Sequence, residues 1–126
     1  MEIEAKLQEQ FVKNQIAYGI ANDEFNYRRV NKLYDGGQEI LRLIWRTRGG
    51  GLLVLDGLSM HREPYVALGA AVGLLPVNEE IALKKLHELE ESNNSNVAYN
   101  ARMCISEWKK GGMRNIRDIY LEESAK

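Results

Sequence analysis

Apolar residues recur every three or four positions along most of this chain, which is the spacing of one face of an α-helix. Two long stripes of this kind fill residues 2–21 and 27–44, with a short polar stretch between them. Their apolar positions are Ile3, Leu7, Phe11, Val12, Ile16 and Ile20, followed by Tyr27, Val30, Tyr34, Gly37, Leu41 and Ile44. No convincing run alternates apolar and polar residues as a strand would. The pattern therefore predicts an all-α protein that begins with a helical hairpin over residues 1–48.

A glycine pair, Gly36-Gly37, lies in the middle of the second stripe. A glycine inside a helix costs about 1 kcal/mol relative to alanine, so a break in the helix is one interpretation. The apolar phase is unchanged across the pair, which favours a continuous helix in which Gly37 lets the hairpin helices approach closely. We expect Asn22 or Asp23 to cap this second helix, and the three glycines at 49–51 to end it.

The rest of the chain is predicted to form two helix pairs and a tail. The apolar residues 52–58 give the first short helix, and Pro64 suits the first position of the next. Asn78 and Ser95 are expected to cap the two helices that follow. The inner face of the last of these helices is expected to hold Val97, Ala101, Ile105 and Trp108. We thus predict one helical domain over residues 1–126. Its two helix pairs occupy residues 52–111, and residues 112–126 form a C-terminal tail or short docking helix.

The two helix pairs look like copies of one another. The apolar set Val66, Ala70 and Leu74 recurs 31 residues later, at Val97, Ala101 and Ile105. Helix pairs that repeat at such a period and stack on one another form α-solenoids. The alternative is a chance similarity between two amphipathic helices.

The stretch HREPYVALGAA, residues 61–71, resembles the second-helix signature of HEAT repeats. The order of a hairpin containing YRRVNKLYD, then RGG, then a leucine-rich turn of helix and two such pairs is similar to a small bacterial family of HEAT-like domains of unknown function. This resemblance covers about residues 11–110 and implies a short α-solenoid, with the N-terminal hairpin stacked on two HEAT-like helix pairs. HEAT helices usually carry arginine after the valine. This chain has Ala67 and Ala98 there, so any ladder of polar contacts from that arginine is missing.

Charge and composition narrow the classes of function. The chain has 17 Lys and Arg against 18 Asp and Glu, a net charge of −1, whereas a sequence-blind nucleic-acid binder is normally basic. Its single cysteine rules out an internal disulfide or a cysteine-built metal site. The first ten residues lack the features of a signal peptide, and the longest apolar stretch, around residues 66–75, is about half a membrane span. We expect a cytoplasmic protein with no membrane partner.

The residue types that carry chemistry do not converge on a catalytic set. His87 and Glu91 are four positions apart and could supply two metal ligands, but no third ligand is signalled, and a solvated helix face is the simpler interpretation. Cys104 lies beside an inner helix face, where a thiol behaves as a small hydrophobe. The glycines at 49–51 lack the Lys-Ser/Thr of a phosphate loop. The sequence therefore predicts no enzyme, no metal and no cofactor.

Two kinds of surface residue indicate a protein interface instead. Uncharged tyrosine, asparagine and methionine side chains are expected on the outer faces of the second helices of the two pairs, a composition typical of interfaces. Acidic residues are expected around the helix that Asn78 caps and in the turn before Pro64, where they would attract a basic partner. The predicted partner-binding residues are Glu63, Tyr65, Glu88, Glu90, Glu91, Tyr99, Asn100 and Met103.

These features favour a non-catalytic protein-binding module. The specific hypothesis is an immunity protein that binds and neutralises a cognate bacterial toxin, which would be a basic domain. A scaffold or regulatory adaptor of the HEAT type is the first alternative. A nucleic-acid-binding domain is a weaker one, because its basic residues are interleaved with Asp35 and Glu39 on the second helix. The basic residues are Arg28, Arg29, Lys32, Arg42, Arg46 and Arg48.

Overall fold

A computed structural model describes residues 2–125 of the chain, and the described residues form helices and turns with no strand. The all-α prediction is thereby confirmed, while the expected domain limits Met1 and Lys126 lie outside the described residues. The helices are α1 (Glu2–Asp23), α2 (Tyr27–Trp45), α3 (Leu52–Leu58), α4 (Pro64–Leu74), α5 (Glu79–Leu89), α6 (Ser95–Lys109) and α7 (Arg114–Ser124), with a single 3-10 turn at Arg48–Gly51.

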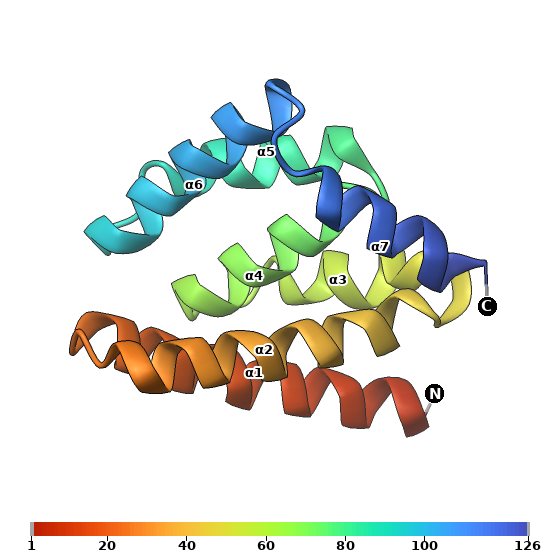
Figure 1. Cartoon of the computed structure of the whole chain (residues 1–126), viewed down its shortest axis with the longest axis horizontal. Coiled ribbons are helices and arrows are strands. Elements are labelled where there is room, and N and C mark those ends of the chain that lie inside the picture. The colour runs from red at the N-terminus through yellow and green to blue at the C-terminus, as the bar shows by residue number, and fades with distance from the viewer. Residues whose placement is uncertain (1, 126) are drawn as a thin grey trace.

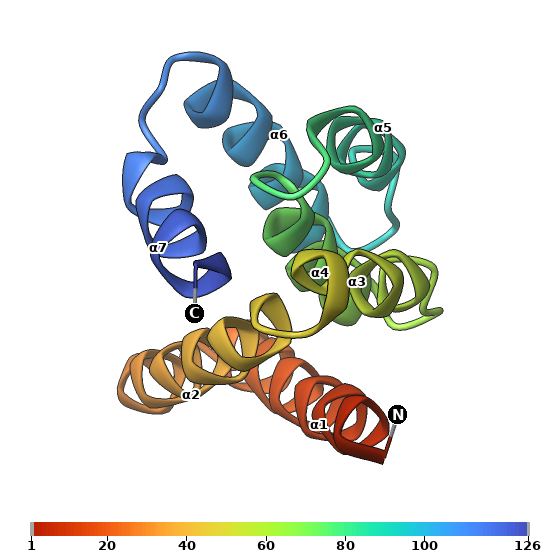
Figure 2. The same cartoon turned by 90° about the vertical axis from the view of Figure 1, so that its right-hand side faces the viewer.

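The helices are arranged in layers around α4 (Figure 1). The α1–α2 hairpin forms one outer layer, α3 and α4 lie against it, and α5 and α6 cover the opposite side of α4. The last helix, α7, returns across the molecule to pack on α2. Viewed along the perpendicular direction, α7 lies on one side of α4, and α3 and α5 lie on the other (Figure 2). Because α4 contacts helices of both outer layers, nearly all of its side chains are buried.

The hairpin helices approach closely where the glycine pair lies. Helix α2 runs without interruption through Gly36 and Gly37, as the unchanged apolar phase predicted. A Cβ atom at Gly37 would lie 2.6 Å from Oδ1 of Asn14 on α1, so a larger residue here would force the Asn14 side chain to move. Asn14 also ties the two helices together, because its side-chain Nδ2 donates a hydrogen bond to the carbonyl of Leu33 at 3.0 Å.

Two of the expected helix caps are wrong by a few residues, and one is confirmed. Helix α1 extends to Asp23, and Asn26 caps α2 by accepting a hydrogen bond from the backbone N–H of Arg29. Asn94, rather than Ser95, caps α6. Asn78 caps α5 as expected. The reason for both errors is that each turn contains several residues with short polar side chains, all of which are good caps.

The glycine-rich connection is only partly as predicted. Helix α2 ends at Trp45, and the backbone is already extended at Thr47, so the helix stops before the glycines, which adopt the left-handed conformation at 49–51. Arg48 consequently lies in the 3-10 turn rather than in the last turn of α2. The short helix over residues 52–58 and Pro64 at the first position of α4 are confirmed.

The contacts between the C-terminal helix and α2 include an aromatic pair and an ion pair. The rings of Trp45 and Tyr120 meet edge to face at 5.7 Å between centroids. The guanidinium of Arg46 donates to the buried carboxylate of Glu123. A short docking helix in the tail, one of the two outcomes predicted from the sequence, is therefore confirmed. Within residues 2–125, no helix combines the length and the apolar character needed to cross a bilayer.

Candidate functional site

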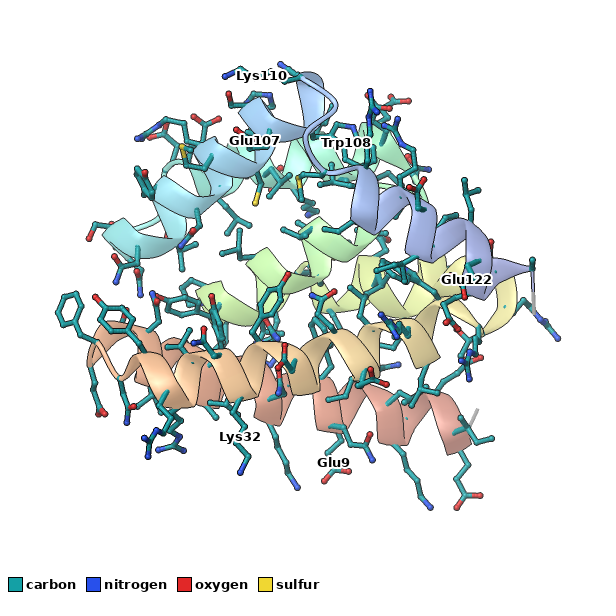
Figure 3. All side chains as sticks on the ribbon, viewed as in Figure 1. Glu9, Lys32, Glu107, Trp108, Lys110 and Glu122 are labelled. Carbon is teal, nitrogen blue, oxygen red and sulfur yellow. The ribbon has the colours of Figure 1, made fainter. Side chains whose placement is uncertain are left out.

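A groove of about 220 Å³ opens between the hairpin and helices α6 and α7, with α4 forming its floor. Its lining is mainly aromatic and aliphatic, with a few amide groups, and includes no charged side chain. The lining residues are Phe11, Gln15, Tyr18, Tyr34, Gly37, Gln38, Leu41, Tyr65, Leu68, Gly69, Val72, Asn100, Cys104, Met113 and Ile116. Charged side chains such as Glu9 and Lys32 on the hairpin and Lys110 beyond α6 point away from this interior (Figure 3). The groove thus presents an uncharged, mainly apolar concave surface.

Two glycines allow the helices at the floor and at one wall of the groove to pack closely. A Cβ atom at Gly69 of α4 would collide with the side-chain oxygen of Gln15, which comes from α1. At Gly37 of α2, as described above, a Cβ would collide with Asn14. The small residues therefore allow α1, α2 and α4 to pack tightly at the base of the groove, while larger side chains form its walls.

Three tyrosines from different helices line the groove. Tyr18 and Tyr65 meet edge to face, with 6.0 Å between ring centroids and 71° between ring planes. Burial raises the pKa of Tyr65 to about 12, and burial also raises the pKa of Tyr18, with a smaller contribution from the nearby Tyr34 phenol. Because these pKa values lie above the ordinary value of 10.0, both hydroxyls keep their protons at neutral pH and can act as donors.

Several polar groups in the groove are available to a ligand. Among the described residues, the hydroxyls of Tyr18 and Tyr34 and the side-chain amide of Gln38 have no hydrogen-bond partner. By contrast, Gln15 donates to Asn14 at 2.8 Å, and Asn100 donates to the carbonyl one turn earlier on α6 at 2.8 Å. The groove therefore offers an apolar body with a few unoccupied hydrogen-bonding groups at its walls, which is the usual make-up of a binding site.

The thiol of Cys104 is also part of the groove wall. Burial raises the pKa of Cys104, so the unreactive protonated form predominates at neutral pH. This agrees with the sequence-based expectation of a small hydrophobe rather than a nucleophile.

Tyr65 lies in a different place from the one the sequence predicted. We expected Tyr65 on an exposed face of its helix, but only 4% of it is exposed, because the hairpin covers this side of α4. The Tyr65 hydroxyl donates to Oδ1 of Asp23 at 2.8 Å and accepts from the side chain of Asn22 at 2.9 Å. Tyr65 therefore belongs to the floor of the groove and its polar edge, and the expected exposed position is wrong.

Of the three α6 residues of the predicted interface, only Asn100 is among the residues that line the groove. Met103 is 40% exposed and Tyr99 is 57% exposed on the neighbouring part of the helix surface. On the facing helix α2, Tyr34 lines the groove and is 49% exposed, and Tyr27, two turns earlier on the same side, is 67% exposed. Exposed aromatic and methionine side chains thus occur on both helices that border the groove.

The predicted acidic residues are only partly available to a partner. Glu88 pairs with Lys85 at 3.7 Å, and Glu90 contacts both His87 at 2.8 Å and Arg102 at 3.8 Å. Glu63 and Glu91 are exposed. The negative potential of this surface is consequently weaker than the sequence suggested. His87 faces Glu90 rather than the Glu91 considered as a metal ligand. Among the described residues, no three side chains of the metal-binding types gather closely enough to hold an ion.

Intramolecular ion pairs also neutralise part of the positive charge of the basic residues on and just after α2. Arg42 pairs with Glu39 at 3.6 Å, and Arg46 pairs with Glu123 of α7. Two of the arginines proposed to contact phosphate are therefore engaged with carboxylates. This arrangement disfavours the nucleic-acid alternative, as the balanced net charge already did.

Sequence reasoning missed most of the groove. Gln15, Tyr18 and Gln38 were not recognised, although Tyr18 and Gln38 each follow or precede a buried glycine and Gln15 lies one turn after the buried Phe11. That signal is weak, because polar residues also border the core in any amphipathic helix. The contribution of Met113 and Ile116 depends on where α7 packs, which no local pattern predicts.

Comparisons with family models, with curated proteins and with solved structures each gave no match to this chain. The resemblance to HEAT-like domains therefore stays a prediction.

Proposed function

We propose that this chain is a non-catalytic protein-binding module and that its partner docks over the groove between the α1–α2 hairpin and α6. The observation that carries this proposal is the combination of an uncharged groove with exposed Tyr34, Tyr99 and Met103 on the helices at its border. Tyrosine and methionine are enriched at the centres of protein interfaces, where they provide large contact areas at a low entropic cost.

The partner class that we propose is a basic bacterial toxin, which the chain neutralises in the cytoplasm as an immunity protein. The support is the set of exposed acidic residues near α5, with Glu91 and Glu63 lacking an ion-pair partner among the described residues. Charges at the border of an interface mainly accelerate association, while the buried centre sets the dissociation rate. The acidic residues would therefore guide a basic partner, and the groove would hold it.

We also propose that α3–α4 and α5–α6 are HEAT-like pairs. The matched positions of the repeat are buried in both copies, at 0% exposure for Val66, Ala70 and Leu74 and at 6% or less for Val97, Ala101 and Ile105. Under this proposal α4 and α6 are the second helices of the two pairs, which HEAT-like stacks present along one concave face, and both helices contribute to the groove.

Co-expression in bacteria tests this function. The chain is produced together with the toxin domain encoded beside its gene, and survival and complex formation are measured. The proposal expects rescue of growth and a stoichiometric complex. A matched pair of variants ties the result to the groove: Gln38→Trp places a large ring inside it, and Leu53→Trp places the same ring at an exposed position on α3. If cells die equally with and without this chain, and no complex is recovered, the toxin hypothesis fails and the adaptor function replaces it.

A further inference from the structure

We infer that the groove receives one aromatic side chain, a tyrosine or a tryptophan, from an uncharged segment of the partner. This inference rests on the proposed protein-binding function and adds the chemistry of the group that is bound. It follows from the size of the groove, from the charge and hydrogen-bonding groups of its wall, and from the exposed side chains on the helices that form it.

The volume fits one ring system. A dry engineered cavity of about 150 Å³ binds a benzene molecule. At about 220 Å³, this groove is large enough for a phenol or an indole, and too small for two rings. The floor and walls supply aromatic faces and edges from Phe11, Tyr18 and Tyr65, which favour another aromatic ring packed edge to face or offset.

The wall chemistry excludes a charged occupant. No Lys, Arg, His, Asp or Glu lines the groove, so an ammonium, a guanidinium or a carboxylate would lose its hydration without meeting an opposite charge. The unpartnered hydroxyls of Tyr18 and Tyr34 and the amide of Gln38 favour a ring that carries its own donor. A phenol O–H can donate to one of these groups and accept from another, and an indole N–H can donate to one of them, whereas a phenylalanine ring can pair with none.

The exposed side chains on the helices that form the groove favour a side chain of a protein over a free small molecule. A free ligand of this size would fill the groove and leave Tyr34, Tyr99 and Met103 facing water. A partner segment that inserts one ring covers these side chains with its neighbouring residues. Such an arrangement, a buried aromatic anchor surrounded by a contact surface that excludes water, is the usual energetic centre of an interface.

The inference is tested by titrating the intact ¹⁵N-labelled chain with capped amino acids and following its amide signals by NMR. The probes are N-acetyl-tryptophanamide and N-acetyl-tyrosinamide, with N-acetyl-phenylalaninamide and N-acetyl-lysinamide as comparisons. We expect saturable shifts at groove residues for the first two, weaker binding of the phenylalanine derivative, and at least tenfold weaker binding of the lysine derivative. Gln38→Trp is expected to weaken the tryptophan and tyrosine probes at least tenfold, and Leu53→Trp to leave them unchanged.

A second variant keeps the inference testable if Gln38→Trp does not fold. Tyr18→Phe keeps the ring that packs on Tyr65 and removes only the hydroxyl, so it should weaken the tyrosine probe about threefold to tenfold. The inference is overturned if the aromatic probes give no saturable shifts, or if the lysine derivative binds equally well. It is also overturned if uncapped 4-methylphenol or 3-methylindole binds and the capped derivatives do not, because the groove then accepts a free small molecule.

The two proposals fail in different ways. If a protein complex forms on co-expression but the aromatic probes do not bind, the partner contacts the chain without an aromatic anchor, and only this inference is wrong. If the probes bind in the groove but no protein complex forms on co-expression, the proposed function is wrong. The preference of the groove for an uncharged aromatic ring is still supported.

Discussion

The side-chain amide of Asn96 at the start of α6 donates a hydrogen bond to Oδ1 of Asp23 at the end of α1, with 2.8 Å between the two atoms. The same carboxylate oxygen accepts a hydrogen bond from the hydroxyl of Tyr65 at 2.8 Å. Asp23 therefore joins the hairpin to both α4 and α6. Because the hairpin and α6 are opposite walls of the groove, this junction fixes how far apart the walls stand at one end.

Removing the carboxylate should loosen that end of the groove. We expect Asp23→Ala to lower the free energy of unfolding by about 1–2 kcal/mol, because two hydrogen bonds to a charged acceptor at a partly solvated site are lost. Urea denaturation measures the change. Glu24→Gln is the control, since Glu24 is the next residue and is exposed. A loss in Asp23→Ala no larger than in the control would show that the junction does not hold the helices together.

The raised pKa of Tyr65 predicts that the free energy of unfolding falls at high pH. Its pKa is raised by burial to about 12 in the folded protein, from an ordinary value of 10.0. The folded state therefore holds this proton more tightly than the unfolded state. The resulting stability is fully present below about pH 10 and is lost as the pH rises towards 12.

The variant Tyr65→Phe isolates this effect from the other groups that titrate at high pH. At pH 7 it should be less stable than the wild type by about 1–2 kcal/mol, because the hydrogen bonds to Asp23 and Asn22 are gone. Phenylalanine does not ionise, so the gap between the two proteins should narrow between pH 10 and 12. Urea melts at a series of pH values measure it, and a gap that is constant or widens would contradict the assignment.

The ion pair between Arg46 and Glu123 predicts how firmly α7 is held. Glu123 is only 4% exposed, and Arg46 reaches it from the end of α2. Glu123→Ala should free α7 from the hairpin and speed tryptic cleavage at Arg114 and Arg117. Glu122→Ala, which alters an exposed neighbour on the same helix, should leave the cleavage rate unchanged. Equal cleavage of the two variants would mean that other contacts hold α7 in place.

Substitution of Trp108 tests which face of α6 is buried in the core. The residue is 6% exposed, and the guanidinium of Arg117 lies 4.4 Å from its ring centroid. Trp108→Ala should lower the free energy of unfolding by about 3–5 kcal/mol, because the substitution leaves a large cavity in the core. Urea denaturation gives the value, and a loss below about 1 kcal/mol would mean that the ring contributes little to the core.

The helices could be predicted because the information that defines them is local. The apolar period across Gly36 and Gly37 correctly indicated one continuous helix, and Asn78 and Pro64 marked helix starts through their own backbone chemistry. The buried set on α6 also followed from its spacing. Where a turn offered several short polar residues, as at Asn94 and Ser95, local chemistry did not select between them.

The groove could not be predicted because it depends on contacts between distant segments. Whether Tyr65 is exposed is decided by the hairpin, which packs on α4 and brings Asp23 to the Tyr65 hydroxyl. The charge of the acidic surface is decided by pairs such as Glu90 with Arg102, which lie on different helices. The exposure of Tyr99 and Met103 on α6 agrees with the sequence analysis, because the helical period alone identifies that face.

The dissociation rate of the complex with its partner tests the central claim most directly. The complex obtained by co-expression is dissociated on a biosensor surface, and the rate is compared among the wild type, Gln38→Trp, Tyr99→Ala and Leu53→Trp. If a partner is held at the groove, Gln38→Trp should dissociate at least tenfold faster. Tyr99→Ala should dissociate about 30-fold faster if it acts as an anchor contributing about 2 kcal/mol, and Leu53→Trp should match the wild type. A wild-type rate for Gln38→Trp, or the absence of any complex, would contradict the claim.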